Sequence, residues 1–211
     1  MPADGLWKTF GASVLVLLTG LVLLFQATER GSAFTTEVLR RATVDRRAQP
    51  IPNLSLRDDQ GNQTTLHDLL STDSRISIVD FVYLRCRTVC TSLGSSYQRL
   101  QQQIVERGLQ SRVQLLSVSF DPANDDITAL RDYAQRMRLD PAAWRVVTLA
   151  SADDRQLLLD AFGIVVIPAP LGEFEHNAAL HIVNSKSMLV RIIDVDDAAR
   201  ALEFAVAAAG P

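Results

Sequence analysis

Residues 76–100 read ISIVDFVYLRCRTVCTSLGSSYQRL and join a strand, two cysteines and a helix in one continuous stretch. The first eight residues are β-rich and nearly all apolar, which is typical of a central strand buried on both faces. Beyond the cysteines, apolar residues recur at helical spacing, so we expect a helix over residues 91–107. The stretch therefore predicts that Cys86 and Cys90 lie where a buried strand ends and a helix begins.

The segments on either side of this stretch alternate between strand and helix patterns. A strand, a helix and a parallel strand form the βαβ unit of α/β folds. The order predicts a thioredoxin-like α/β sandwich with a central mixed sheet over residues 52–211. The expected elements are a hairpin and short helix at 53–70, strands at 113–120, 145–150, 178–184 and 188–194, helices near 127–137, at 151–163 and after 196, and an irregular loop at 165–177.

The first thirty residues differ from the rest of the chain. Residues 10–25 read FGASVLVLLTGLVLLF without a charge, and with the residues before them they reach about 20 residues, the length that a bilayer core requires. We therefore expect an N-terminal membrane anchor, one transmembrane helix, over residues 1–30 and a linker over residues 31–51. A cleaved signal peptide with its cleavage site after Ala33 is the alternative, but the apolar run is long for a signal peptide, and Arg30 lies between the run and that site.

The charges that flank the apolar run leave the orientation of the anchor open. Five arginines follow the run, while only Lys8 and the amino terminus precede it. The positive-inside rule alone would place the C-terminal domain in the cytoplasm. That rule can fail for a single anchor followed by a large domain, so charge does not decide the compartment.

Composition excludes one large class of partner. The chain has 211 residues, a net charge of −3 and 47% apolar residues, which suits one sizeable domain with an appendage. Acidic residues slightly outnumber basic ones, and no Lys/Arg stripe interleaves with aromatic residues. We therefore expect no nucleic-acid partner.

Cys86 and Cys90 are the only cysteines, and their spacing places both sulfurs on one face of the first helical turn. Cα atoms about 6 Å apart would permit a disulfide, and two thiolates could equally bind a soft ion such as Cu(I) or Zn(II). The helix N-terminus and the neighbouring Arg85 and Arg87 favour thiolates. A disulfide across so short a loop would stabilise the fold only weakly, so a redox pair or a metal site is the better hypothesis.

Three histidines are candidates for a third ligand. His67 follows a polar stretch and is expected at the solvated surface. His181 lies inside a predicted strand, where a packed imidazole is the common outcome. His176 lies in the loop before that strand, and a thioredoxin-like fold places this loop beside the cysteine turn. From the residues alone, however, a loop histidine is more often a solvated side chain than a ligand.

Three motifs in order along the chain resemble those of the Sco/SenC family, membrane-anchored thioredoxin-like copper proteins linked to assembly of the copper centre of cytochrome c oxidase. FVYLRCRTVC (81–90) is similar to the family's F-x-Y-T-x-C-P-x-V-C-P. VSFDPANDD (118–126) is similar to S-x-D-P-x-x-D, and EHNAALHIVN (175–184) is similar to D-H-S-x-x-x-Y-L-I-D. The resemblance covers about residues 50–208.

The resemblance implies a ligand set, a cargo and a location. Cys86, Cys90 and His176 fall on the family's copper ligands and would hold one copper per chain, as Cu(I) or Cu(II). Asp121 and Asp125 would shape the neighbouring loop. The implied partners are the copper-bearing subunit of cytochrome c oxidase or another copper chaperone. The implied location is the inner (cytoplasmic) membrane, single-pass, with the globular domain in the periplasm or an equivalent compartment.

The chain departs from the family pattern close to these positions. Arg87 and Thr91 replace the prolines that follow the cysteines, and Leu84 replaces the motif threonine. Glu175 and Asn177 replace the Asp and Ser that flank the histidine. We therefore expect loop rigidity, hydrogen bonding around the ligands and copper affinity to differ from the family's.

Asp80 supports a second hypothesis from the enzyme class. The sequence V-D-F six residues before a cysteine is similar to thioredoxins, in which a buried acid helps to move the proton of the second thiol. A buried carboxyl has a raised pKa and could act as a general base, whereas at the strand end it would be hydrogen-bonded or wet. The chain would then be a thiol-disulfide oxidoreductase that reduces the cysteines of a copper-site protein through Cys86 and Cys90. A peroxidase is less favoured, because Tyr83 occupies the threonine position of peroxiredoxins.

Overall fold

The computed structural model describes residues 3–27, 36–85, 89–170 and 173–210. The chain divides into two compact units, Met1–Thr43 and Val44–Pro211. In the first unit, helix α1 (Ala3–Ala27) exposes large apolar side chains between Trp7 and Leu23. Within the described ranges, no helix has the length and apolarity needed to cross a membrane. The predicted transmembrane helix is therefore not confirmed.

The segment predicted as a linker contains regular structure. Helix α2 (Thr36–Arg46) begins there, and Glu37 forms ion pairs of 3.1 Å with Arg40 and 2.8 Å with Arg41. Pairs at these spacings stabilise a helix without any apolar periodicity, which explains why the sequence pattern did not reveal it. Strand β1 (Gln49–Pro50) follows and joins the main sheet.

The globular unit is built on a mixed sheet, which among the described residues has the order β1-β10-β9-β4-β5-β6-β2-β3. Strands β4, β5 and β6 run parallel, and the strands outside them pair in antiparallel fashion. This arrangement confirms the predicted thioredoxin-like α/β fold with a mixed central sheet. The strands after β1 are β2 (Ser55–Asp58), β3 (Gln63–Thr65), β4 (Ile76–Val82), β5 (Val113–Ser119), β6 (Trp144–Leu149), β9 (Leu180–Val183) and β10 (Met188–Ile193).

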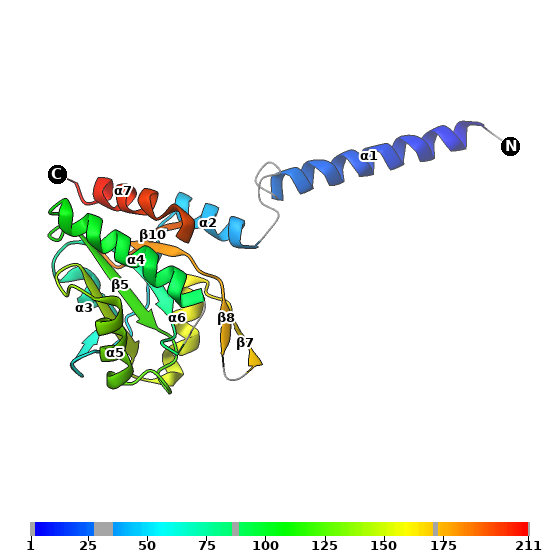
Figure 1. Ribbon diagram of the computed structural model, residues 1–211. Helices are drawn as coiled ribbons and strands as arrows, with labels where there is room; N and C mark the ends of the chain where they lie inside the picture. Colours follow the sequence, from blue (N-terminus) through cyan, green and yellow to red (C-terminus); the bar gives the residue numbers. More distant parts are fainter. Residues whose placement is uncertain (1–2, 28–35, 86–88, 171–172, 211) are drawn as a thin grey trace. The chain divides into compact units, whose positions relative to one another are not determined.

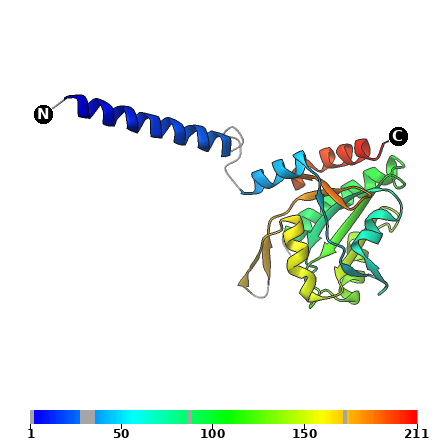
Figure 2. The same ribbon diagram turned by 180° about the vertical axis from the view of Figure 1, so that it is seen from behind.

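Helices cover both faces of this sheet. One apolar cluster joins the sheet to α4, α5 and α7, which lie towards the viewer in Figure 1, and the other joins it to α3 and α6, which come forward in Figure 2. Short 3₁₀ turns, Ala152–Asp154 and Val195–Asp197, precede α6 and α7. The helices are α3 (Leu66–Ser71), α4 (Val89–Glu106), α5 (Ile127–Met137), α6 (Arg155–Phe162) and α7 (Ala198–Ala208).

Strand β4 is the centre of the sandwich, because every residue in it is buried. Ile78 and Val82 belong to the cluster beneath α4, while Val79 and Phe81 belong to the cluster beneath α6. A strand that packs on both faces needs apolar residues at odd and even positions alike. The nearly continuous apolar run in the sequence therefore predicted this strand correctly.

The segment predicted as an irregular loop before the last strands holds a small hairpin. Strand β7 (Val166–Pro168) pairs with β8 (Phe174–His176), and Val166 lies opposite His176 in the register. Each strand is only three residues long, and β7 ends at a proline, so the pattern resembles a turn-rich loop. The structure thus places His176 on a strand rather than in a loop.

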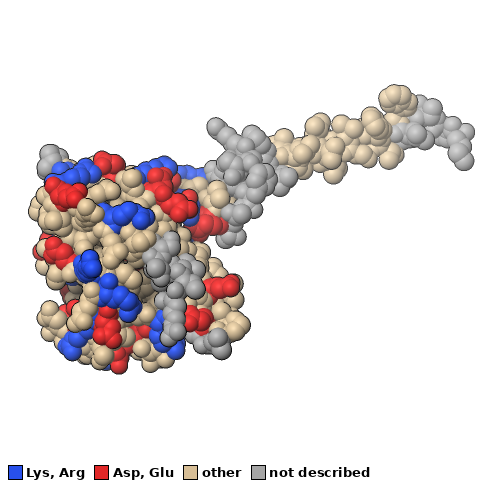
Figure 3. Space-filling model, viewed as in Figure 1, with Lys and Arg blue, Asp and Glu red and all other residues tan. Residues whose placement is uncertain are grey.

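Charged side chains of both signs are mixed over the face of the globular unit that Figure 3 shows. Some of them form ion pairs between segments, such as the 2.6 Å pair of Arg107, directly after α4, with Glu203 on α7. Exposed pairs of this kind contribute little to stability. The two apolar clusters therefore supply most of the free energy that holds the layers together.

Candidate functional site

The two cysteines can be placed only in part. Cys86 lies outside the described residues, and Cys90 lies in the first turn of α4. The side chain of Cys90 lies outside the described atoms, so the placement of both sulfurs on one face of the helix stays a prediction. Within the described ranges, no group of three or more His, Cys, Asp or Glu side chains is arranged to hold a metal ion.

His176 lies beside the segment that leads into the cysteine loop. Its half-buried ring meets the rings of Phe120 and Tyr83 edge to face, with centroid separations of 5.3 and 6.3 Å. Tyr83 directly follows β4 and precedes Cys86 by three residues. The fold therefore brings β8 to the end of β4, as the thioredoxin-like topology predicts.

The two ring nitrogens of His176 have different surroundings. Nδ1 lies 3.2 Å from the carbonyl oxygen of Asn177, and since a carbonyl oxygen can only accept, this hydrogen bond requires the proton on Nδ1. Nε2 is buried and has no hydrogen-bond partner among the described residues. Burial lowers the pKa of His176, although the bond to Asn177 opposes this, so the ring is neutral near pH 7. A neutral imidazole with an unused lone pair is the form that binds metals, and this nitrogen fits a metal ligand.

Tyr83 fastens the β7–β8 hairpin to the end of β4. Its hydroxyl has a single proton, which is shared between the Glu173 carboxylate at 2.7 Å and the Phe174 carbonyl oxygen at 3.1 Å. The guanidinium of Arg155, on α6, lies 4.8 Å from the centroid of the Phe174 ring and 5.5 Å from that of Phe120. Aromatic, cationic and hydrogen-bonding contacts therefore hold the strand that carries His176.

A buried carboxylate holds the start of the cysteine loop. Asp125 accepts hydrogen bonds from the Leu84 N–H at 2.9 Å and from the Ser119 hydroxyl at 2.6 Å, and burial raises its pKa. Arg85 forms a 3.2 Å ion pair with Asp121. The S-x-D-P-x-x-D segment thus anchors Leu84 and Arg85, which agrees with the loop-shaping role that the resemblance implies.

Asp80 lies deep in the core and not at a wet strand end. It shares the face of β4 that packs beneath α4 and lies opposite Ser117 in the parallel register. Burial raises the pKa of Asp80 to about 7, although the Ser117 hydroxyl and the N–H of Asp80 oppose the shift. Neither carboxyl oxygen has a hydrogen bond of standard geometry among the described residues. A group with this pKa can exchange a proton near neutral pH.

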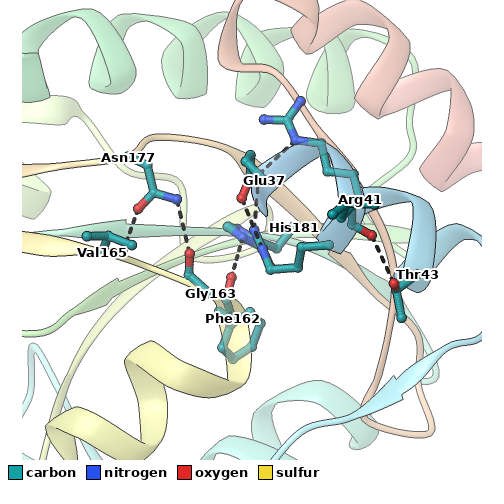
Figure 4. Close-up of polar contacts among 10 residues, drawn as sticks. Glu37, Arg41, Thr43, Phe162, Gly163, Val165, Asn177 and His181 are labelled. Carbon is teal, nitrogen blue, oxygen red and sulfur yellow. Dashed lines mark hydrogen bonds and ion pairs between the residues drawn. The ribbon is translucent and has the colours of Figure 1, made fainter. Parts of the chain in front are cut away.

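The other two histidines have structural contacts. His181 is buried in β9, meets the rings of Phe81 and Phe162 edge to face and lies with Nε2 3.2 Å from the Phe162 carbonyl oxygen (Figure 4). The prediction of a packed strand histidine is confirmed. His67 is half-buried, and its Nε2 lies 2.7 Å from the Ile51 carbonyl oxygen. The prediction of a solvated surface residue is therefore wrong, because His67 ties α3 to the chain before β2.

Asn177 is a site residue whose role the sequence did not reveal. Its Nδ2 donates to the Gly163 carbonyl oxygen at 3.0 Å, and its Oδ1 accepts from the Val165 N–H at 2.7 Å (Figure 4). Asn177 thereby bridges the residue next to the candidate ligand and the chain between α6 and β7. The only signal in the sequence was the departure from the family's serine at this position.

Comparisons with known proteins agree on the fold. A SCO1 protein homolog from Bacillus subtilis (strain 168) is 23% identical over 126 residues, which are 58% of this chain. The match spans 64% of that relative, slightly less than two thirds of its length.

Two solved structures have the same fold. Arabidopsis thaliana ScoI with copper bound superposes with a TM-score of 0.63 at 16% identity, over 74% of this chain and 98% of that one. BsSco, a member of the Sco family of cytochrome c oxidase assembly proteins in which a disulfide switch has been identified, superposes with a TM-score of 0.61 at 19% identity, over 76% and 95%. The family model described as SCO1/SenC matches residues 44–209. With this match over most of its length, the chain belongs to the SCO1/SenC family.

Proposed function

We propose that this chain binds one copper ion through Cys86, Cys90 and His176 and delivers it during assembly of the copper centre of cytochrome c oxidase. The observation that carries the proposal is the buried Nε2 of His176, which has no hydrogen-bond partner among the described residues. It lies on a strand fastened to Tyr83, three residues before Cys86. Membership of the SCO1/SenC family supports the same reading.

The donor set suits a cargo that must be released. Two thiolates stabilise Cu(I), and an imidazole extends the tolerance to Cu(II). Three protein ligands leave copper accessible to the ligands of a receiving protein, such as the copper-bearing oxidase subunit or another copper chaperone. Loading requires reduced thiols, so in an oxidising compartment a reductant must act first.

The residues around the donors have distinct tasks. The rings of Tyr83 and Phe120 meet the His176 imidazole edge to face, and burial lowers the pKa of His176, which keeps the ring neutral. Asp125 and the hydrogen bonds that it accepts fix the backbone that enters the cysteine loop. The chain therefore prepares the histidine and the loop before copper arrives.

A copper titration tests this proposal. The reduced, full-length chain, kept anaerobic, should bind one Cu(I) and one Cu(II), and His176→Ala should weaken Cu(II) binding by more than tenfold. Cys86→Ser and Cys90→Ser should each abolish tight Cu(I) binding. His67→Gln is the matched control, since it changes a histidine that contacts a backbone carbonyl elsewhere. Binding that is weak in the wild type, or indifferent to His176, would exclude the proposed site.

A second candidate function rests on Asp80. In this function Cys86 and Cys90 reduce a disulfide in a copper-site protein: two electrons and two protons leave the dithiol, which becomes a disulfide, and the substrate gains two thiols. Asp80, with a pKa of about 7, would accept a thiol proton during exchange. The disulfide switch identified in BsSco favours redox activity of the pair. Turnover of a model disulfide that falls in Asp80→Asn, with a changed pH profile, would support this function, whereas no turnover would exclude it.

Location completes the proposal. Residues 1–30 would attach the chain to the inner membrane, with the globular unit in the periplasm or an equivalent compartment. The uncharged run at residues 10–25 supports attachment. A reporter fused to the C-terminus, together with membrane fractionation of the full chain and of a chain lacking residues 2–30, tests both parts. A cytoplasmic reporter signal, or an unchanged membrane fraction without the segment, would contradict them.

A further inference from the structure

The strand that carries His176 is held apart from the main sheet. Strand β8 pairs only with β7 among the described strands, through three residue pairs, and neither belongs to the large sheet. An isolated two-stranded hairpin of this length is marginal in water. Side-chain contacts must therefore set the position of the histidine.

Two sets of contacts hold β8, one on each side of His176. On the N-terminal side, the single proton of the Tyr83 hydroxyl is shared between the Glu173 carboxylate and the Phe174 carbonyl oxygen. On the C-terminal side, the Asn177 carboxamide bonds to the Gly163 carbonyl oxygen and the Val165 N–H, using a donor and an acceptor at once. Asn177 thus fixes the backbone directly after the histidine against the end of α6, as Figure 4 shows.

The backbone of Asn177 also contacts the imidazole itself. Its carbonyl oxygen accepts from Nδ1 of His176 at 3.2 Å, which selects the tautomer with the lone pair on Nε2. The Asn177 carboxamide immobilises the residue that supplies this carbonyl. The hydrogen bonds of the Asn177 side chain and the tautomer of His176 are therefore coupled. Residues that hold a metal-binding histidine by its second nitrogen orient the ring and raise its basicity.

We propose that Asn177 is a positioning residue for His176: its carboxamide fixes the carbonyl that holds Nδ1 and thereby keeps Nε2 available as a ligand. The expected effect on copper affinity rests on the proposed copper site, but the effect on the orientation and tautomer of the His176 ring does not require copper. The carboxamide donates through Nδ2 and accepts through Oδ1, two separate atoms, whereas a serine hydroxyl would have to donate and accept through one oxygen on a shorter side chain.

The first measurement uses the full-length chain without copper. Nitrogen-15 spectra of the histidine rings should show the Nδ1–H tautomer for His176 in the wild type and a mixture of tautomers in Asn177→Ala. Asn184→Ala is the matched control, because the Asn184 carboxamide also binds two backbone groups, the N–H groups of Lys186 and Met188, in the β9–β10 turn. It should lower stability by a similar amount and leave the His176 signals unchanged, which separates positioning from general loss of structure.

The second measurement is a double-mutant cycle in copper affinity. Asn177→Ala should weaken Cu(II) binding by about 10–100-fold, as is typical for loss of a group that orients a ligand. In a His176→Ala background, the same change should have no further effect, because both act through one ring.

The outcomes separate this proposal from the proposed function. Wild-type ring signals in Asn177→Ala would overturn the positioning role, whether or not copper binds. A loss of affinity that persists in the His176→Ala background would also overturn it. If the ring signals shift as expected but the wild type binds no copper, the positioning role holds and the copper proposal fails.

Discussion

At the scale of single residues, Asp80 should govern part of the pH dependence of stability. Burial raises its pKa to about 7 in the folded chain, whereas in the unfolded chain it is about 4. The folded state therefore keeps a proton that the unfolded state loses between these values. This contribution is fully present below about pH 4 and is lost as the pH rises through about 7.

Replacement of Asp80 by asparagine tests this directly. Asp80→Asn should be more stable than the wild type at pH 8, and its free energy of unfolding should fall less between pH 4 and pH 7. Urea unfolding at several pH values measures both quantities. Asp160→Asn, at an exposed carboxylate on α6, should keep the wild-type slope. Equal slopes in the wild type and Asp80→Asn would show that the pKa of Asp80 is not raised in the folded chain.

The sequence could specify some residues of the site and not others. Asp80 could be assigned to a buried strand because its neighbours on both sides are apolar. The role of Asn177 could not be predicted from the sequence. Its hydrogen-bond partners, Gly163 and Val165, lie 14 and 12 positions earlier in the chain, and no local pattern predicts such a bridge. Hydrogen bonds made across a turn depend on backbone positions that only the folded chain defines.

At the scale of elements, long and strongly patterned segments were predictable. Helix α4 and strands β4, β5 and β6 follow from apolar runs or stripes that bury against a neighbour. Helix α2 and the β7–β8 hairpin could not be predicted in this way. Ion pairs stabilise α2, and side-chain contacts from other elements fix the hairpin. Short elements held by polar contacts leave no hydrophobic period in the sequence.

Asp125, in the loop after β5, holds the backbone of Leu84 at the start of the cysteine loop, so its replacement should lower the stability of the fold strongly. Asp125→Ala removes the acceptor for the Leu84 N–H and the Ser119 hydroxyl, both buried. Leaving these donors unsatisfied should lower the free energy of unfolding by about 2–3 kcal/mol. Asp126→Ala, which removes the exposed N-cap of α5, should cost only about 1 kcal/mol. Equal losses in urea unfolding would contradict a special role for the buried carboxylate.

The end of α5 offers a stabilising substitution. Arg138 caps this helix in the left-handed region, with φ of 54°, where a side chain with a Cβ is strained. Arg138→Gly should therefore raise the free energy of unfolding by about 0.5–1 kcal/mol. Arg138→Ala keeps the Cβ and should bring no gain. Thermal unfolding of the two variants compares them, and a gain in Arg138→Ala alone would point to charge and not to backbone strain.

At the scale of the whole molecule, the site lies where several separate segments meet. The end of β4 supplies Tyr83 and the backbone of Leu84, the loop after β5 supplies Asp125, and β8 supplies His176. The thioredoxin-like order brings the end of β4 and β8 together, so the sequence could predict their proximity. It could not predict the hydrogen bonds among them, because these bonds depend on side-chain directions at the meeting point.

The coordination of copper in the intact chain tests the central proposal most directly. X-ray absorption of the reduced, full-length chain loaded with one Cu(I) should show two sulfur neighbours and one nitrogen. In His176→Ala the nitrogen should be lost and the two sulfurs kept, while the His67→Gln control should match the wild type. A copper coordination shell without sulfur, or a nitrogen ligand that remains in His176→Ala, would contradict a site made of Cys86, Cys90 and His176.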